Sequence, residues 1–301
     1  MNGFFNIWKP VGMSSAAVVA VMRRLTEQKR VGHAGTLDPE AAGVLPIMAG
    51  KATRLFDYLV DKEKEYEAVI AFGRSTDTQD ATGETLETGD CLPDLSTVRE
   101  KALLLTGEIR QRPSVYSAIK VGGKPLYARA RRGETPEVPE RTVRVDSIEV
   151  LSAAPDGSMA LRVKCGKGTY IRTLCHDLGR LCGCPAHMRS LIRTRSGVFT
   201  AAESIPLEEA RERTAEGRLQ ELLIPPEAPL MHLPAAEIKT SFGRQVAAGA
   251  KLPLTAVLGE APPAGVPLRM RCAGEFWGIG EVREGQLVWR VQLAPEEGDK
   301  P

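Results

Sequence analysis

The sequence predicts an α+β fold: a mixed, largely antiparallel sheet flanked by helices, followed by a small C-terminal β-barrel-like module. Segments with apolar residues at helical spacing are interleaved with segments in which apolar and polar residues alternate, as in half-buried strands. Strand-like segments also follow one another directly, which is typical of antiparallel pairing. A proline-rich stretch at 216–234 precedes a last region of short alternating segments and glycine turns.

The first element predicted is a helix over 14–29. Ser14 or Ser15 can cap its N-terminus. Its apolar stripe has helical spacing and consists of Val18, Val19, Met22 and Leu25. A second helix is predicted through 52–61.

Asp38 lies in the small, glycine-rich stretch 30–46. The local pattern predicts a helix start, with Asp38 as the N-cap, Pro39 as the first helical residue and Glu40 as a first-turn acid. A single carboxylate locked against a proline can instead take part in a reaction. The local pattern favours the cap and leaves the other interpretation open.

The segment 64–73 predicts a strand, because alternate residues on one face are large or apolar: Tyr66, Ala68, Ile70 and Phe72. The polar loop 74–83 that follows does not fit the spacing of a calcium-binding loop. Further helices are predicted over 96–107 and 170–183, further strands over 143–153 and 159–166, and a helix at the start of 216–234.

A basic stretch runs from Lys120 to Arg144. Seven basic residues against three glutamates give it a local charge of +4, broken by glycines and prolines. The basic residues are Lys120, Lys124, Arg129, Arg131, Arg132, Arg141 and Arg144. With the aromatic Tyr127, such a loop could grip a phosphate backbone and stack a base. It could equally be a solvated insertion with ordinary surface charge.

The bulk properties are those of an ordinary soluble chain of 301 residues. The net charge is only +2, so any nucleic-acid-binding face must be a local patch. No apolar run approaches the roughly 20 residues of a membrane span. The N-terminus lacks the pattern of a secretory signal, and we therefore expect a cytoplasmic protein without a membrane partner.

Six cysteines are present, and in a chain of this kind they are expected to be reduced thiols. One cluster suggests a metal site, because soft ligands lie close together at Cys175, His176, Cys182, Cys184 and His187. The pairing is C-x-C rather than C-x-x-C and no second pair follows. Buried apolar cysteines on a helix therefore fit better than zinc, and no metal is expected.

Five ordered blocks of the sequence carry a resemblance to a known family. They are "WKPVGMSS" at 8–15, "VGHAGTLDPEAAGVLPI" at 31–47, "KEYEAVIAFGRSTDTQDATG" at 64–83, "GTYIRTLCHDLG" at 168–179 and "LIRTRSGVF" at 191–199. Together they resemble the bacterial tRNA pseudouridine synthases of the TruB type. The resemblance implies the pseudouridine synthase fold over 1–228 and a small PUA-type RNA-binding module over 236–301.

The resemblance also implies an activity and a set of residues. The family isomerises the T-loop uridine of tRNA, position 55, to pseudouridine. Asp38 matches the catalytic aspartate and Arg172 the arginine that pairs with it. Three more residues match those that handle the flipped base: Tyr66 stacks on it, Leu191 forms an apolar wall, and His33 takes its vacated place. Lys9 matches the opening motif near the site, and 120–144 matches a thumb-like loop that holds the T-stem.

The chemistry agrees with this set of residues. Pseudouridine formation breaks the N1–C1′ bond and rejoins the uracil through C5 without redox change, so no cofactor is expected. A carboxylate can attack the base, attack the sugar or assist a cleaved intermediate, and the sequence leaves these routes open. Arg172 would offset the cost of burying a charged Asp38. Gly35 and Gly43 would let a nucleotide approach the backbone.

Three alternatives remain at this stage. The first is a non-catalytic tRNA-folding chaperone on the same scaffold, which would be expected to lack Asp38 or Arg172. The second is the guide-RNA-dependent relative that works in a larger particle with partner proteins. The third is a zinc protein built on Cys175 to His187. The presence of both charged residues and the lack of basic extensions favour a stand-alone enzyme, monomeric and without an obligatory protein partner, whose partner is the T-arm of tRNA.

Overall fold

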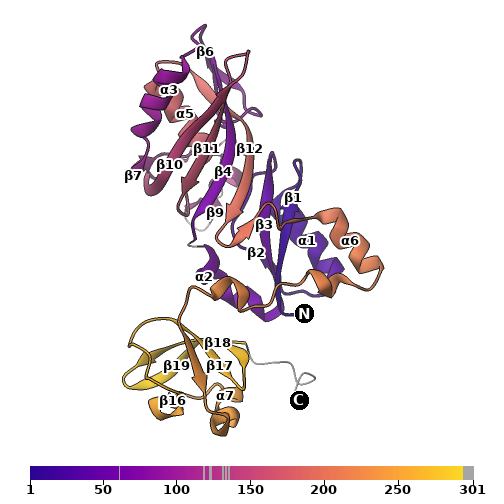
Figure 1. The fold of residues 1–301 in the computed structure, drawn as a ribbon. Helices are drawn as coiled ribbons and strands as arrows, with labels where there is room; N and C mark the ends of the chain where they lie inside the picture. The colour runs from indigo at the N-terminus through magenta and orange to yellow at the C-terminus, as the bar shows by residue number, and fades with distance from the viewer. Residues whose placement is uncertain are drawn as a thin grey trace.

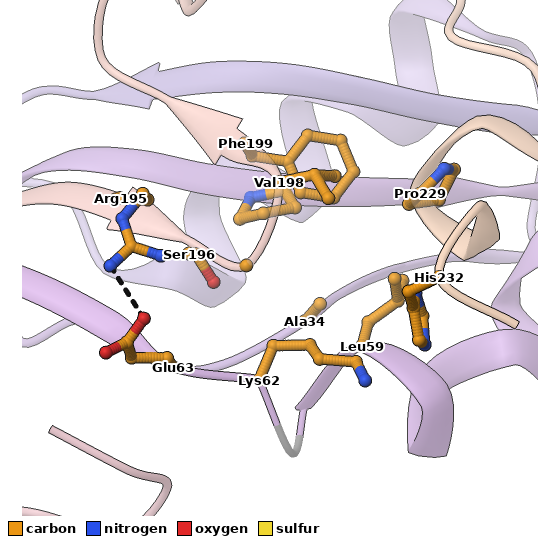
Figure 2. Close-up of a pocket in the computed structure, with 12 residues that line it drawn as sticks. Ala34, Leu59, Lys62, Glu63, Arg195, Ser196, Val198, Phe199, Pro229 and His232 are labelled. Carbon is orange, nitrogen blue, oxygen red and sulfur yellow. Dashed lines mark hydrogen bonds and ion pairs between the residues drawn. The ribbon is translucent and has the colours of Figure 1, made fainter.

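The computed structural model describes residues 1–60, 62–117, 119–121, 124–130, 132, 134 and 136–293. Figure 1 shows two parts, a large curved sheet with its helices and a small curled sheet below it. The chain enters the large sheet first and reaches the small one through the connection that carries Pro229 and His232 (Figure 2). The α+β class and the β-rich C-terminal module are therefore confirmed.

The large sheet has ten strands in the order β14-β1-β3-β12-β4-β11-β10-β7, with β2 paired to β3 and β13 to β12. Its strands are β1 Gly3–Lys9, β2 Val31–His33, β3 Ala41–Ala49, β4 Lys64–Phe72, β7 Gly107–Gln111, β10 Arg141–Ala153, β11 Met159–Cys165, β12 Ala186–Ser196, β13 Phe199–Thr200 and β14 Ile205–Pro206. Pairing is antiparallel except at β1–β14 and β3–β12. The predicted mixed, largely antiparallel sheet is confirmed.

Helices cover this sheet in two groups (Figure 1). The helices are α1 Ser15–Leu25, α2 Phe56–Val60 after a 3₁₀ turn Gly50–Leu55, α3 Leu95–Leu103, α4 Leu126–Ala130, α5 Ile171–Leu181 and α6 Leu207–Ala215. The cap of α1 is Ser14, whose hydroxyl accepts a hydrogen bond from the Ala17 amide. The apolar faces of α1, α3 and α5 share one core with the strands. The predicted helices over 14–29, 52–61, 96–107 and 170–183 are confirmed, with shorter ends.

The helix predicted to start at Asp38 is wrong. Asp38 lies in the connection from β2 to β3, where the Ala41 amide donates to its carbonyl oxygen at 3.1 Å, and a strand follows. All nine residues of β3 are buried, with neighbours on both sides in the sheet. A strand buried in this way shows no alternation, so periodicity cannot distinguish it from a helix.

Two other predictions need correction. The helix expected at the start of 216–234 is only a 3₁₀ turn, Leu219–Leu222, and α6 lies before it. Within the basic stretch the chain forms the short strands β8 Lys120–Val121 and β9 Lys124–Pro125 and then α4. Leu126 is fully buried in a small apolar cluster with Ile119 and Val138, so this stretch is not simply a solvated insertion.

The small sheet has five strands in the order β15-β17-β18-β19-β16. They are β15 Ala235–Ile238, β16 Leu252–Pro253, β17 Leu268–Cys272, β18 Glu275–Arg283 and β19 Gln286–Gln292, with the short helix α7 Gly243–Ala247. This sheet has its own apolar core. A further cluster joins it to the large part, because Ile279 and Val291 pack with Phe4 and Leu59.

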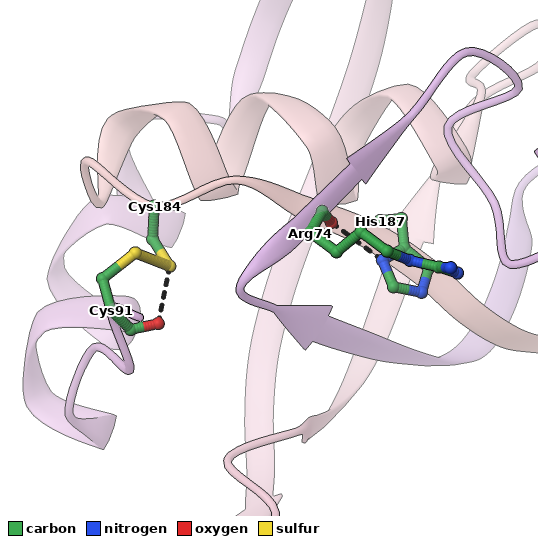
Figure 3. Close-up of a disulfide and its surroundings, with 4 residues drawn as sticks. All are labelled: Arg74, Cys91, Cys184 and His187. Atoms are coloured by element: carbon green, nitrogen blue, oxygen red, sulfur yellow. Dashed lines mark hydrogen bonds between the residues drawn. A yellow bond between two sulfur atoms is a disulfide. The ribbon is translucent and has the colours of Figure 1, made fainter. Parts of the chain in front are cut away.

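The cysteines differ from the expectation of six reduced thiols. Cys91 and Cys184 form a disulfide (Figure 3). It joins the segment between β6, Thr85–Thr88, and α3 to the turn between α5 and β12. The two positions are 93 residues apart, so local spacing cannot reveal the pair. The other four cysteines are free.

The zinc alternative does not fit this arrangement. Cys184 is bonded to Cys91, and Cys175 is fully buried on α5. Among the described residues, no group of three or more His, Cys, Asp or Glu side chains could hold a metal ion. Nor does any helix in the described part of the chain combine the length and apolarity that a bilayer crossing requires.

Candidate active site

A cavity of about 320 Å³ opens where β4 and β12 meet the β2–β3 connection and the N-terminus of α5. Five of the residues predicted from the sequence line it: His33, Asp38, Tyr66, Arg172 and Leu191. They come from segments far apart in the chain, which the sheet order brings together. A concave site of this size with a few converging polar groups is the expected form of a small-substrate site.

Asp38 and Arg172 form an ion pair at this cavity. The Arg172 Nε lies 3.1 Å from Asp38 Oδ2. The Arg172 side chain is only 7 % exposed, whereas that of Asp38 is 40 % exposed. The carboxylate is thus held from the protein side and open to a ligand on the other. Arg172 is the second residue of α5, at the N-terminus of the helix.

A second carboxylate, Asp80, holds Arg172 from behind. Its Oδ2 lies 3.2 Å from Arg172 Nη1, and the same guanidinium donates to the carbonyls of Thr78 and Tyr116. Burial alone would raise the pKa of Asp80, but hydrogen bonds from Thr82 and Thr78, together with Arg172, hold it below its usual value. The sequence analysis missed Asp80. The only indication in the sequence was that Asp80 lies between two threonines, Thr78 and Thr82.

Arg193 is the second residue that the sequence analysis missed. It is 1 % exposed on β12 and lines the same cavity. Its guanidinium donates to the carbonyls of Val44, Gly35 and Thr36 at 2.7, 3.1 and 3.4 Å. Among the described residues no carboxylate forms an ion pair with it. The hydrogen bonds to Gly35 and Thr36 therefore fix the loop that carries Asp38.

Tyr66 stands next to Arg193 in this network. Burial raises the pKa of the Tyr66 hydroxyl, while the charge of Arg193 and a hydrogen bond from it oppose the shift. Leu191, on β12, pairs with Ala68 of β4, so its side chain and that of Tyr66 share one wall. Both residues are 7 % exposed.

His33 is the last residue of β2 and also lines the cavity. Burial, and then the charge of Arg193, lower its pKa, so the ring is neutral near pH 7. Its Nδ1 is buried without a hydrogen-bond partner in the described part of the chain. A neutral ring with one unsatisfied nitrogen fits a residue that moves or bonds on ligand binding.

Lys9 does not line the cavity. It is fully buried under the Asp38 turn, and its ammonium donates to the carbonyls of Met13, Pro10 and Pro39 at 2.5, 2.8 and 3.1 Å. Burial lowers the pKa of Lys9 to about 8, although Glu40 and Asp38 oppose the shift. The structure gives this residue a role in holding the turn.

The two glycines expected to admit a nucleotide differ. Gly35 lines the cavity. Gly43 does not: a Cβ there would lie 2.3 Å from the Arg193 carbonyl oxygen, so this glycine lets β3 and β12 approach each other. The prediction for Gly43 is therefore wrong.

The basic stretch is partly outside the described residues. Arg131 is not described, nor are the side chains of Lys120, Lys124 and Tyr127. Arg129 and Arg132 both pair with Glu134, at 2.6 and 3.1 Å. At the end of the stretch, the Arg141 guanidinium lies 5.8 Å from the ring centre of Tyr170, which lines the cavity. The stretch thus reaches the rim of the site.

Comparison with known proteins agrees with the five blocks. Residues 23–171 match the TruB family pseudouridylate synthase N-terminal domain, and 172–231 match the tRNA pseudouridylate synthase B C-terminal domain. The tRNA pseudouridine synthase B of Bacillus licheniformis is 45 % identical over 257 residues, 83 % of each chain. That of Alkaliphilus oremlandii is 40 % identical over 284 residues, 94 % of each chain.

Solved structures extend the likeness to the fold. A Cbf5-Nop10-Gar1 complex contains a chain with a TM-score of 0.70 and 30 % identity, covering 93 % of this chain and 78 % of that one. An H/ACA RNP bound to a substrate RNA containing 2′-deoxyuridine contains another with a TM-score of 0.73 and 26 % identity, covering 98 % and 86 %. The matched domains and the extent of these identities assign the chain: it belongs to the TruB family of pseudouridylate synthases.

Proposed function

We propose that this pseudouridine synthase acts on tRNA and isomerises the T-loop uridine at position 55. The observation that carries the proposal is the Asp38–Arg172 ion pair, which presents a half-exposed carboxylate to a cavity of about 320 Å³. The cavity walls include Tyr66 and Leu191, which suit a flat base. Relatives with 40 to 45 % identity carry the name tRNA pseudouridine synthase B.

Each residue then has a role. Asp38 acts on the glycosidic carbon or the base, and Arg172 orients its carboxylate through the ion pair. Tyr66 stacks on the uracil, and Leu191 keeps the base from leaving while it turns. His33 occupies the place of the base in the loop, which offsets the cost of flipping. Lys9 supports the turn through its bond to the Pro39 carbonyl.

The rest of the chain would hold the tRNA. We propose that residues 1–228 form the catalytic domain and 236–301 a PUA-like RNA-binding module. Within the first, the basic loop 120–144 would hold the T-arm by phosphate contacts from Lys120, Lys124, Arg129, Arg131 and Arg132. The enzyme would act as a monomer in the cytoplasm, with no obligatory protein partner and no cofactor.

The guide-RNA-dependent alternative has less support. One solved neighbour comes from a Cbf5-Nop10-Gar1 complex and the other from an H/ACA RNP, and their identities to this chain are 30 and 26 %. The bacterial relatives are more similar, with up to 46 % identity, and their names state tRNA. The names of the more similar group therefore support tRNA as the substrate, and we propose that the enzyme recognises folded tRNA directly.

The test uses an unmodified tRNA transcript incubated with purified protein and without added metal or cofactor. Pseudouridine is mapped at single-nucleotide resolution for wild type and Asp38→Asn, which keeps the side-chain shape and removes the charge. We expect conversion at position 55 by wild type and none by the variant, because the neutral amide cannot act as a nucleophile. Asp90→Asn, at an exposed position, is the matched control and should convert fully.

Two outcomes would contradict the proposal. Conversion at another nucleotide would show that the protein is a pseudouridine synthase whose target is not position 55. Tight tRNA binding with no conversion by wild type would favour the folding-chaperone alternative and reduce Asp38 to a structural residue.

A further inference from the structure

A second cavity, of about 290 Å³, lies beside the candidate active site and has no part in the function proposed above. The β2–β3 connection, the end of α2, the β12–β13 turn and the connection to the small sheet enclose it (Figure 2). Its volume lies just below the usual range of about 300 to 1,000 Å³ for small-ligand sites, close to the volume of the cavity at Asp38.

The two cavities are separated by a wall one backbone thick. Ala34 lines the second cavity, whereas its neighbours His33 and Gly35 line the first. On β12, Arg193 lines the first cavity and Arg195 the second. A strand of RNA with one nucleotide in the first cavity would thus have its neighbours close to the second.

Apolar side chains line more than one side of the second cavity, and one of them is an aromatic ring. Phe199 and Leu59 are 4 and 5 % exposed, and Pro229 adds a flat face from the connection. Val198 forms the rim and is 55 % exposed. Figure 2 shows Phe199 and Val198 on one side and Leu59 on the other. Such walls accept the face of an aromatic ring.

Polar side chains also line the cavity. Ser196, on β12, is 4 % exposed and is one of them. The Lys62 side chain extends toward His232 (Figure 2). Burial and the charge of Lys62 lower the pKa of His232, although a hydrogen bond with the Pro229 backbone opposes the shift. The carboxylate at this cavity, Glu63, is already engaged by Arg195 at 2.9 Å.

This combination suits an anionic ligand with an aromatic ring. The cation of Lys62 has no counter-ion among the described residues, so a phosphate would find an uncompensated charge beside a neutral imidazole that can donate to it. The Ser196 hydroxyl can pair with a ribose or a base edge. A ligand without a ring would leave the apolar wall unused.

We propose that this second cavity binds one nucleotide, with its base against Phe199 and its phosphate at Lys62 and His232. The inference rests on the proposed function, because an RNA bound at the neighbouring cavity supplies such a nucleotide next to the target. The same chemistry could come from a free nucleotide. The experiment below separates the two sources.

The experiment combines protein variants with substrate variants. Unmodified tRNAs carry a single abasic site at each position flanking the target uridine, and Kd is measured for wild type and for a triple variant, Lys62→Met, Ser196→Ala, Phe199→Leu, which also removes the ring that the base would contact. In wild type one abasic position should weaken binding about 5-fold or more, since stacking a base contributes about 1 to 3 kcal/mol. In the triple variant the same position should have little effect. Lys29→Met removes an exposed lysine that lines neither cavity and should behave as wild type.

A second arm tests free nucleotide. Uridine 5′-monophosphate at millimolar concentration is titrated into protein with labelled methyl groups, and shifts of Leu59 and Val198 are followed. Shifts without any abasic coupling would assign the cavity to a free nucleotide. Equal abasic effects in both proteins together with unshifted methyls would overturn the proposal. The readout is binding, so an RNA that couples as expected but is not isomerised would refute the proposed function alone.

Discussion

Arg172 links two carboxylates of different exposure, and this difference separates their roles. Asp38 faces the cavity, while Asp80 is 11 % exposed and has hydrogen bonds from two threonines. Asp80 does not line the cavity, so we expect it to act through Arg172 as a positioning residue. The charge of Asp80 keeps the guanidinium in the geometry that serves Asp38.

The consequence is testable with Asp80→Asn. Loss of one charge-assisted hydrogen bond costs about 1.5 to 3 kcal/mol, so kcat should fall roughly 10- to 150-fold. KM should change little, because the cavity walls remain. Single-turnover conversion and tRNA binding are measured in parallel, with Asp177→Asn on α5 as a control away from the ion pair. A variant that loses tRNA binding in proportion to activity would contradict the positioning role.

Sequence reasoning found the residues that family motifs mark, and it missed those that matter only by their meeting in space. The Asp38–Arg172 pair was expected from the resemblance and is present. Arg193 and Val44 are 149 residues apart, and Asp80 and Arg172 are 92 apart. No spacing rule connects such positions. The buried polar environment of Arg193 exists only once β3 and β12 are side by side.

At the scale of elements, exposure decided which predictions were right. Strand β4 has one partly exposed face, so buried and partly exposed residues alternate along most of it, and the sequence pattern at 64–73 therefore predicted the strand correctly. Strand β3 is buried throughout and does not alternate, and the cap-like pattern Asp38-Pro39-Glu40 just before it led to a helix prediction. A helix with a solvated face, such as α1, was equally easy to find. The periodic signal is therefore informative only where part of the element meets water.

The disulfide is an element-scale feature with a measurable effect on stability. It ties the segment before α3 to the turn between α5 and β12, and it closes a loop of 93 residues. A crosslink of this span stabilises by about 2 to 5 kcal/mol, chiefly by restricting the unfolded chain. Reduction, or Cys91→Ser, should therefore lower the free energy of unfolding by that order.

The measurement is chemical denaturation with and without reductant. Cys182→Ser is the matched control, because Cys182 is a free thiol on the same turn. Reductant should lower the free energy of unfolding of the Cys182→Ser control as much as that of wild type. It should not change the free energy of unfolding of Cys91→Ser. If wild type and Cys91→Ser unfold at the same denaturant concentration without reductant, the crosslink does not stabilise the fold.

The whole molecule combines a nearly neutral chain with a proposed polyanionic partner. Its net charge is only +2, so attraction to RNA must come from local surfaces. One such surface is the basic stretch, where Arg129 and Arg132 share a single glutamate, Glu134. Because one carboxylate cannot neutralise two guanidinium groups, positive charge remains there to meet phosphates. The stretch also packs near Tyr170, so binding at this surface would lie beside the candidate active site.

Neutralising this surface should therefore change how tRNA binding depends on salt. In the triple variant Arg129→Gln, Arg131→Gln, Arg132→Gln we expect weaker tRNA binding and a slope of log K against log salt that is shallower by up to about 3, since each phosphate contact contributes about 0.9. A matched triple, Arg211→Gln, Arg213→Gln, Arg218→Gln on and after α6, removes the same charge from another surface. Kd is measured from low to moderate salt for all three proteins. If both triples flatten the slope equally, the effect reflects total charge and the basic stretch is not the grip. If only the first does, tRNA is held at the rim of the cavity that contains Asp38.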